Sequence, residues 1–258
     1  MDNGYTLTNK VVLVTGASRK IGIGAAIARE LAQGGADVFI TYYQAYDASM
    51  PWGSNPVEAE ALLVELHEIS VRTAGLELDL TNPDAPKHLF DRVEAELGPV
   101  DILVNNATHS ERDGIEALTA ELLDKHYALN VRAMALLCAE FARRFRKSEG
   151  GRIINMSSGQ GFGPMPGELA YVATKGAVEA FTVSLSAELA PRRITVNAVD
   201  PGATDTGWMS PEFKAELQAS APMGRIGQPE DAARLVRFLA SPAAAWITGQ
   251  VIHSRGGS

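Results

Sequence analysis

The sequence predicts a doubly wound α/β fold: one parallel seven-stranded sheet with helices on both faces. Short β-branched runs with little polar alternation recur along the chain, which is the pattern of strands buried on both faces. The segments between these runs are long enough for crossover helices. No repeat, charge block or Pro/Ser linker divides the 258 residues, so we expect a single domain over residues 1–258.

Seven runs are expected to form the strands, at residues 10–15, 37–41, 73–78, 101–105, 152–156, 195–199 and 250–253. Helices are predicted at residues 24–33, 83–97, 119–147 and 171–189, and Gly34-Gly35 ends the first of them. Residues 44–56 and 203–229 are rich in Gly, Pro and Ser and are predicted to be irregular. Because long connections beyond strand C-termini usually surround the ligand in such sheets, both stretches are candidates for the ligand site.

Composition excludes several classes of function. The 23 Lys and Arg against 31 Asp and Glu give a net charge of -8, which disfavours nucleic acid as a partner. The longest early apolar run, residues 11–14, is far shorter than the ~20 residues of a membrane span. The single cysteine, Cys138, cannot form an intrachain disulfide, and the five histidines lack metal-ligand spacing. We therefore expect a soluble cytoplasmic protein with no metal and no membrane partner.

A glycine-rich turn, Thr-Gly-Ala-Ser-Arg-Lys-Ile-Gly-Ile-Gly at residues 15–24, joins the first expected strand to the first helix. Glycine lets backbone N–H groups approach a phosphate, and the helix N-terminus adds favourable partial positive charge. In a Rossmann-type sheet this is the dinucleotide-binding turn. Taken by itself, the turn is equally compatible with a merely tight connection.

The ends of the second and third strands bear on which coenzyme binds. An acidic residue after strand two favours NAD and a cation favours NADP, and here Tyr42 follows with no carboxylate. Arg19 and Lys20 of the first turn could neutralise a 2'-phosphate, so NADP(H) is preferred. Asp47, a carboxylate in the connection after strand two, leaves NAD(H) as the alternative coenzyme. Asp79, after strand three, would accept a hydrogen bond from adenine or cap a turn.

Four residues suggest proton chemistry. Tyr171 and Lys175 are four apart, which places both on one face of a helix. Free tyrosine titrates near ~10, so a neighbouring cation would help it exchange protons at neutral pH; the alternative is a packed tyrosine and a solvated lysine. Ser158 follows strand five and could bond a carbonyl oxygen or simply form a turn. Asn130 is a poor helix former in an apolar helix, either functional or bonded to backbone.

Together these motifs resemble the compact branch of the short-chain dehydrogenase/reductase (SDR) family, most closely the 3-oxoacyl-[acyl-carrier-protein] reductases. The matching motifs, in the family's order, are Thr15-Gly16, Asp79, Asn105-Asn106-Ala107, Asn130, Ser158, Tyr171-x-x-x-Lys175, Asn197, Pro201-Gly202 and Ile247-Thr248-Gly249-Gln250. The resemblance implies that Tyr171 is the general acid/base and that Lys175 lowers its pKa and binds the nicotinamide ribose. It also implies that Ser158 orients the carbonyl, Asn130 holds a relay water and Thr206 contacts the carboxamide.

The resemblance also implies an extended set of coenzyme contacts. These are Gly16, Ser18, Arg19, Lys20, Gly22, Ile23, Tyr42, Asp79, Leu80, Asn106, Ala107, Tyr171, Lys175, Pro201, Gly202, Thr204 and Thr206. Two positions depart from the family pattern. Five residues instead of three separate Gly16 from Gly22, read as a two-residue insertion carrying Arg19 and Lys20. Thr108 replaces a glycine and is expected to crowd the backbone near the nicotinamide.

The implied reaction is reversible hydride transfer between nicotinamide and a carbonyl carbon. An acyl-carrier-protein thioester is one expected substrate, because the basic run at residues 143–147 and Arg192-Arg193 could dock an acidic carrier. The alternative for that run is a solvated helix end. A free ketone or secondary alcohol of secondary metabolism is the other substrate class, under an apolar lid of Trp208, Met209 and Phe213.

Two further expectations concern binding and assembly. A nucleotide-binding member without turnover is disfavoured, because Ser158, Tyr171 and Lys175 are all intact. Tyr46 and Trp52, in the long connection after strand two, would cover the adenosine end or pack on a neighbouring subunit. The family's habit implies a homotetramer that packs the helices containing Asn130 and Tyr171 against their symmetry mates.

Overall fold

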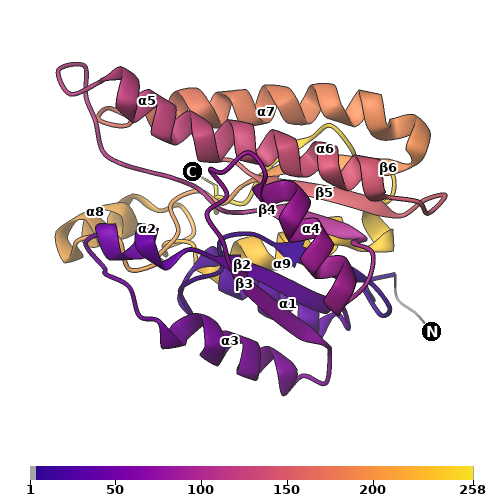
Figure 1. Cartoon of the computed structure of the whole chain (residues 1–258). Helices are drawn as coiled ribbons and strands as arrows, with labels where there is room; N and C mark the ends of the chain where they lie inside the picture. Colours follow the sequence, from indigo (N-terminus) through magenta and orange to yellow (C-terminus); the bar gives the residue numbers. More distant parts are fainter. Residues whose placement is uncertain (1–3, 258) are drawn as a thin grey trace.

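The computed structural model describes residues 4–257, and its seven strands form one sheet in the order β3-β2-β1-β4-β5-β6-β7 (Figure 1). Every neighbouring pair is parallel. The strands are β1 (Val11–Val14), β2 (Asp37–Tyr42), β3 (Thr73–Glu77), β4 (Ile102–Asn105), β5 (Gly151–Met156), β6 (Ile194–Asp200) and β7 (Val251–His253). The predicted seven-stranded doubly wound sheet is therefore confirmed.

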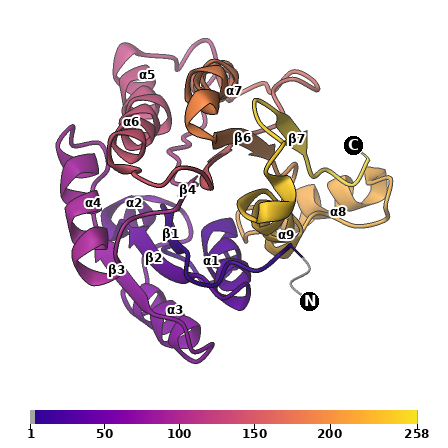
Figure 2. The ribbon, with the colours of Figure 1, turned by 90° about the vertical axis from the view of Figure 1, so that its right-hand side faces the viewer.

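Helices cover both faces of the sheet, which Figure 2 shows as a middle layer between two helical layers. They are α1 (Ile23–Gln33), α2 (Gln44–Ser49), α3 (Val57–His67), α4 (Ala85–Glu96), α5 (Ala120–Tyr127), α6 (Met134–Arg144), α7 (Leu169–Leu189), α8 (Pro211–Ser220) and α9 (Pro229–Ala240). Among the residues that the structure describes, no helix has the length and apolar character needed to cross a membrane.

Two hydrophobic cores lie on opposite faces of the sheet. Every residue of β1, β4, β5 and β6 is buried, as expected for apolar strands covered on both sides. Ile27 of α1 and Val236 of α9 pack in one core, and Phe90 of α4 and Phe141 of α6 pack in the other. Burying each such side chain stabilises the fold by about 1.5–3 kcal/mol. The result is a rigid sheet from which the connecting loops project.

The long helix predicted at residues 119–147 is interrupted. Thr119 caps α5 by accepting a hydrogen bond from the Leu122 N–H, and a π-helical turn at Ala128–Ala133 separates α5 from α6. The backbone becomes extended at Phe145, so α6 ends earlier than predicted. Because π turns are rare and concentrate at functional sites, the turn around Asn130 marks this part of the chain for attention.

The two stretches predicted to be irregular each contain a short helix, α2 within residues 44–56 and α8 within residues 203–229. The hydroxyl of Ser210 accepts a hydrogen bond from Phe213 N–H and caps α8. In α9, Gln228 and Asp231 form a capping box. These local caps stabilise helices in segments whose glycine and proline content favours loops.

Candidate active site

The carboxyl ends of β1, β4, β5 and β6 lie along one edge of the sheet and lead into short polar connections. The first residues of interest after these strands are, in that order, Gly16, Asn106, Ser158 and Pro201. The strand order reverses between β1 and β4. In doubly wound sheets, ligands bind beyond the carboxyl ends at this reversal.

The glycine-rich turn requires glycine at two positions. A Cβ on Gly16, whose φ is +74°, would lie 2.6 Å from the Ala107 Cα. A Cβ on Gly24 would lie 2.5 Å from the Gly16 carbonyl oxygen and 2.6 Å from Asn106 Nδ2. Asn106 Nδ2 donates to the carbonyls of Thr15 and Gly16, both at 2.9 Å. The turn is thus held tightly against the start of α1.

The N-terminus of α1 faces this turn without a side-chain cap. Gly22 is the N-cap residue and no side chain accepts from the first-turn N–H groups. Such N–H groups, with the positive end of the helix dipole, form a ready anion site. The longer turn is closed by a hydrogen bond from the Gly22 N–H to the Arg19 carbonyl at 3.0 Å. The turn therefore fits the pyrophosphate of a dinucleotide.

A cavity of about 350 Å³ continues from the turn toward the end of β2. Arg19 lines it, donates to the Thr206 carbonyl at 2.6 Å and stacks its guanidinium 4.6 Å from the centroid of the Trp52 ring. Lys20 does not line it: its ammonium lies 3.1 Å from Glu65, and its N–H donates to Glu58 at 2.7 Å. Of the predicted cation pair, only Arg19 faces the cavity.

The carboxylates of Asp47 and Glu58 also line this cavity, whereas Asp79 does not. Asp47 lines it, is 6% exposed and accepts a hydrogen bond from Trp52 Nε1 at 3.0 Å. Asp79 accepts from the Thr81 N–H at 2.8 Å and from the Thr81 hydroxyl at 2.6 Å, so it caps the turn after β3. Asp79 therefore forms the turn cap that was the alternative to a bond with adenine.

Tyr171, Lys175 and Ser158 converge beside the carboxyl end of β5. The Lys175 ammonium is buried, donates to the Met156 carbonyl at 2.9 Å and lies 5.5 Å from the Tyr171 ring centroid. Burial lowers the pKa of Lys175 to about 8. Burial raises the pKa of Tyr171, and a hydrogen bond with the Ser158 side chain opposes that rise. The phenol therefore stays protonated at neutral pH, with a hydroxyl and a cation beside it.

Asn130 lies in the π turn, and its side chain has no hydrogen-bonding capacity to spare. Its Nδ2 donates to the His109 carbonyl at 2.9 Å and to the Thr174 hydroxyl at 3.0 Å. Its Oδ1 accepts from the His109 N–H at 2.7 Å and from the Thr108 hydroxyl at 3.1 Å. Four bonds fill a carboxamide. The side chain holds the backbone of the β4 connection, and Thr108, which replaces a glycine, directs its hydroxyl to this set.

The loop after β6 closes the other side of the site. The Thr204 hydroxyl donates to the carbonyls of Pro201 and Gly202, both at 3.2 Å. Trp208 Nε1 donates to the Thr204 carbonyl at 3.1 Å, and the Trp208 ring packs against Phe213 with centroids 5.7 Å apart. These two rings pack against each other, and the apolar lid of Trp208, Met209 and Phe213 stays a prediction.

Comparison with known proteins agrees with this geometry. The family model described as "Enoyl-(Acyl carrier protein) reductase" matches residues 16–258. A solved short chain dehydrogenase from Burkholderia cenocepacia J2315, in complex with NADP, is similar to this chain with a TM-score of 0.86 and 35% sequence identity, covering 97% of this chain and 98% of that one. The chain belongs to the short-chain dehydrogenase/reductase family.

Curated members of the SDR family cover nearly the whole chain. The "Uncharacterized oxidoreductase YjdA" of Bacillus subtilis is 51% identical over 250 residues, 96% of each protein. The "3-oxoacyl-[acyl-carrier-protein] reductase FabG" of Aquifex aeolicus is 38% identical over 257 residues, 97% of this chain and 98% of its own. The protein is therefore an SDR oxidoreductase with a Rossmann-type fold.

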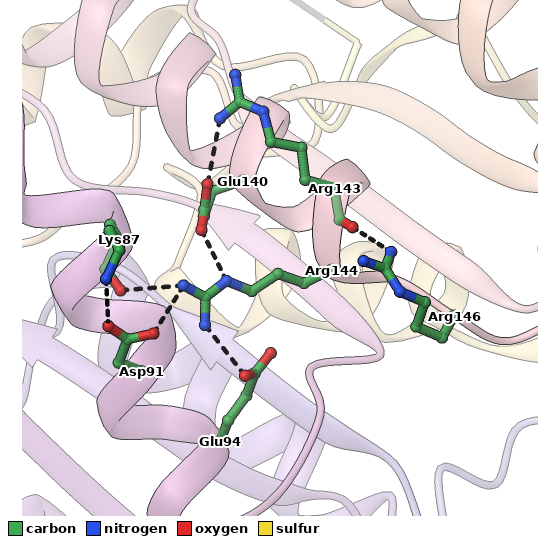
Figure 3. Close-up of polar contacts among 7 residues, drawn as sticks. All are labelled: Lys87, Asp91, Glu94, Glu140, Arg143, Arg144 and Arg146. Carbon is green, nitrogen blue, oxygen red and sulfur yellow. Dashed lines mark hydrogen bonds and ion pairs between the residues drawn. The ribbon is translucent and has the colours of Figure 1, made fainter.

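The basic run that could dock a carrier protein is occupied by internal contacts in this SDR protein (Figure 3). Arg144 is paired with Asp91 at 2.7 Å and Glu94 at 3.0 Å, both on α4, and with Glu140 at 2.7 Å. Arg143 lies 3.2 Å from Glu140. The remaining cations of the two basic segments have partners within the chain: Arg146 with the Arg143 carbonyl, Lys147 with Asp101, Arg192 with the carbonyls of Ala142 and Phe145, and Arg193 with Glu149. The run ties α6 to its neighbours, while Arg143 and Arg193 stay largely exposed, and docking of a carrier protein stays a prediction.

Sequence reasoning missed a buried ion pair in the wall of the SDR site. Asp200 is fully buried and accepts from Arg255 at 3.1 Å and from the Gly202 N–H at 2.9 Å, and it lies 3.0 Å from His253 Nδ1. Arg255 also packs against Gly159, the residue after Ser158. The sequence offered one indication of this pair: Asp200 directly precedes Pro201-Gly202, where its carboxylate can accept a hydrogen bond from the turn that follows.

Other kinds of catalytic centre find no support in the described part of the chain. Residues 4–257 contain no group of three or more His, Cys, Asp or Glu side chains placed to hold a metal ion. Burial raises the pKa of the Cys138 thiol to about 12, which leaves it protonated and a poor nucleophile. The proton-bearing groups that the structure does bring together are those of Ser158, Tyr171 and Lys175.

Proposed function

We propose that this protein is an NADP(H)-dependent reductase that converts a carbonyl to a secondary alcohol, with Tyr171 as the general acid. The observation that carries the proposal is the convergence of Ser158, Tyr171 and Lys175 next to an uncapped glycine turn. The coenzyme supplies or accepts a hydride when bound. Its pyrophosphate would be held by the turn from Gly16 to Gly22 and its ribose by Lys175.

The chain's own residues move the proton. In reduction, the Ser158 hydroxyl donates a hydrogen bond to the substrate oxygen and the Tyr171 hydroxyl gives that oxygen its proton. The Lys175 ammonium then stabilises the phenolate left behind. Because the pKa of Tyr171 is raised, its hydroxyl is protonated at neutral pH, which suits reduction. Oxidation would need Tyr171 as its phenolate and is favoured at higher pH.

The preference for NADP(H) rests on Arg19. It faces the cavity at the end of β2, and a guanidinium is well suited to bind a phosphate. A related dehydrogenase was solved with NADP, which supports the same choice. Asp47 lines the same cavity and could accept bonds from ribose hydroxyls, so NAD(H) remains the alternative.

For the substrate, we propose a small free carbonyl compound bound under Trp208 and Phe213. Arg144 of the basic run at residues 143–147 is held by carboxylates within the chain, and Lys147 is paired with Asp101, which weakens the argument for a carrier protein. A 3-oxoacyl-carrier-protein thioester is the second candidate, supported by the relatives named FabG. Turnover of a carrier thioester and of the matched free ketone, at equal concentrations, separates the two.

We also propose that the protein is a homotetramer. The outer surface of α5 and α7 carries a shallow groove lined by Leu123, Tyr127, Val131 and Ala177, and Tyr127 is 53% exposed. A second copy packed on these helices would bury this apolar surface. Light scattering on the purified protein tests the assembly.

The decisive experiment for the reaction is NADPH oxidation across a panel of carbonyl compounds, with Tyr171→Phe as the test variant. Removing the transferable proton should lower kcat by about 10²–10⁴-fold and leave the fold unchanged. Circular dichroism and thermal melting check the fold. Turnover by Tyr171→Phe near the wild-type rate would disprove the assignment.

A further inference from the structure

The segment at residues 43–56, which follows β2 and contains α2, extends between two parts of the site. In Figure 1, α2 lies beyond the end of β2, outside the sheet. One end of the segment places Trp52 over Arg19 at the adenosine-side cavity. The other places Tyr46 on the connection that follows β4, the same connection that carries Asn106 and Thr108. The segment therefore touches both the coenzyme side and the catalytic side.

Tyr46 makes two contacts with the β4 connection. Its phenol oxygen accepts a hydrogen bond from the Ser110 N–H at 3.2 Å. Its ring packs against the His109 ring, with centroids 5.4 Å apart, and His109 in turn packs edge-on against His126 at 4.7 Å. Tyr46 is thus fixed at both its ring and its hydroxyl.

A continuous chain of hydrogen bonds leads from this contact to the catalytic helix. His109 exchanges two bonds with Asn130, through its N–H at 2.7 Å and its carbonyl at 2.9 Å. Asn130 Nδ2 donates to the Thr174 hydroxyl at 3.0 Å, and that hydroxyl donates to the Tyr171 carbonyl at 2.8 Å. Each step is a bond between groups that are at least partly buried, where displacing a partner is costly.

We propose that Tyr46 is a positioning residue: by holding Ser110 and His109 it fixes Asn130 and, through Thr174, the backbone of Tyr171. The effect on turnover rests on the proposed function, in which Tyr171 donates the proton. The effect on the β4 connection does not. In Tyr46→Phe, the ring would keep its contact with His109, but the Ser110 N–H would lose its hydrogen-bond acceptor.

The first test uses hydrogen exchange on the free protein. In Tyr46→Phe, amide exchange in a peptide covering residues 106–112 should rise about fivefold, the effect of losing one ordinary hydrogen bond. Exchange in α1 should not change. Tyr5→Phe is the matched control, because it removes a tyrosine hydroxyl from a ring that packs against Phe238. Amide exchange at residues 106–112 should be the same in this variant as in wild type. Equal exchange in Tyr46→Phe and wild type would overturn the proposal.

The second test separates positioning from general stability. Tyr46→Phe should lower kcat about threefold to tenfold, within the range expected for a displaced catalytic group, with unchanged NADPH dissociation constant and melting temperature. Thr174→Val interrupts the same chain further along, so the double variant should lose little more kcat than the worse single one. Fully multiplicative losses would show that Tyr46 does not act through Thr174.

The two tests also separate this inference from the proposed function. If wild type reduces no carbonyl compound, the proposed function fails, whereas the exchange experiment still tests the contact of Tyr46 with the β4 connection. If wild type turns over and exchange at residues 106–112 is unaffected by Tyr46→Phe, the inference fails and the proposed function stands.

Discussion

Replacing Arg19 by glutamine should change the choice between NADPH and NADH. Among the described residues, Arg19 is the cation that lines the cavity at the end of β2, since Lys20 is turned toward Glu65. A charge-assisted bond to a 2'-phosphate contributes about 1.5–3 kcal/mol. Arg19→Gln should therefore weaken NADPH binding about 10- to 150-fold.

The diagnostic quantity is the ratio of the two dissociation constants, because Arg19 also has structural contacts. It bonds the Thr206 carbonyl and stacks on Trp52, so some loss of affinity will be common to both coenzymes. NADH, which lacks the phosphate, reports that common part. Calorimetric titration of each variant with NADPH and with NADH gives the ratio directly, and repeating it at higher salt should reduce the difference between coenzymes.

Lys20→Gln is the matched control. It removes a partly exposed pair with Glu65, an interaction of about 0–1 kcal/mol. The NADPH:NADH ratio should change less than threefold, well below the tenfold that 1.4 kcal/mol represents. A larger change in the ratio for Lys20→Gln than for Arg19→Gln would refute the reasoning, because it would place Lys20 and not Arg19 at the phosphate.

Three further outcomes follow from the same structure. Because burial lowers the pKa of Lys175 to about 8, its charge beside Tyr171 is lost as pH rises through 8, so kcat for reduction should decline above that pH, and Lys175→Arg should move the decline upward; a flat profile would contradict this. In the unfolded chain, Lys175 keeps its proton up to about pH 10.5, so between pH 8 and 10.5 the unfolded state binds more protons than the folded state. The free energy of unfolding should therefore rise with pH over this range. Gly24→Ala places a Cβ 2.5 Å from a carbonyl oxygen and should cost about 1–3 kcal/mol, whereas Gly114→Ala has no atom within 4 Å of its new Cβ and should melt like wild type. Arg144→Met should lower the melting temperature by separating α6 from α4 and leave kinetics with a free ketone unchanged; a selective rise in KM for a carrier thioester would instead restore the docking interpretation.

The sheet could be predicted from the sequence because each strand is a local apolar run. The ends of the predicted and observed strands agree to within one residue, and the glycine turn and the Tyr171–Lys175 spacing pointed to the candidate site. The break in the long helix could not be predicted, since the π turn depends on bonds from Asn130 to His109 and Thr174, which lie 21 and 44 residues away. Likewise, the partner of Lys20 stands on α3, at a position the local pattern does not reveal.

The short helices α2 and α8 were missed for a different reason. Their stability depends on a few specific contacts, such as the Asp47–Trp52 bond and the Ser210 cap, within sequences whose composition favours loops. The buried pair of Asp200 and Arg255 was missed because it joins β6 to residues beyond β7, 55 positions later. In each case the deciding interaction is long-range or confined to one cap, where average propensities carry little information.

The contacts of Arg19 have a kinetic consequence. Its guanidinium bonds the loop after β6 through Thr206 and stacks on the segment after β2 through Trp52, so one side chain connects the two covers of the coenzyme cavity. Neither segment can move away from the cavity unless its contact with Arg19 breaks or Arg19 moves with it. If the proposed coenzyme binds in this cavity, its departure would require both segments to open together, and in many enzymes that close over a ligand this release step sets the turnover rate.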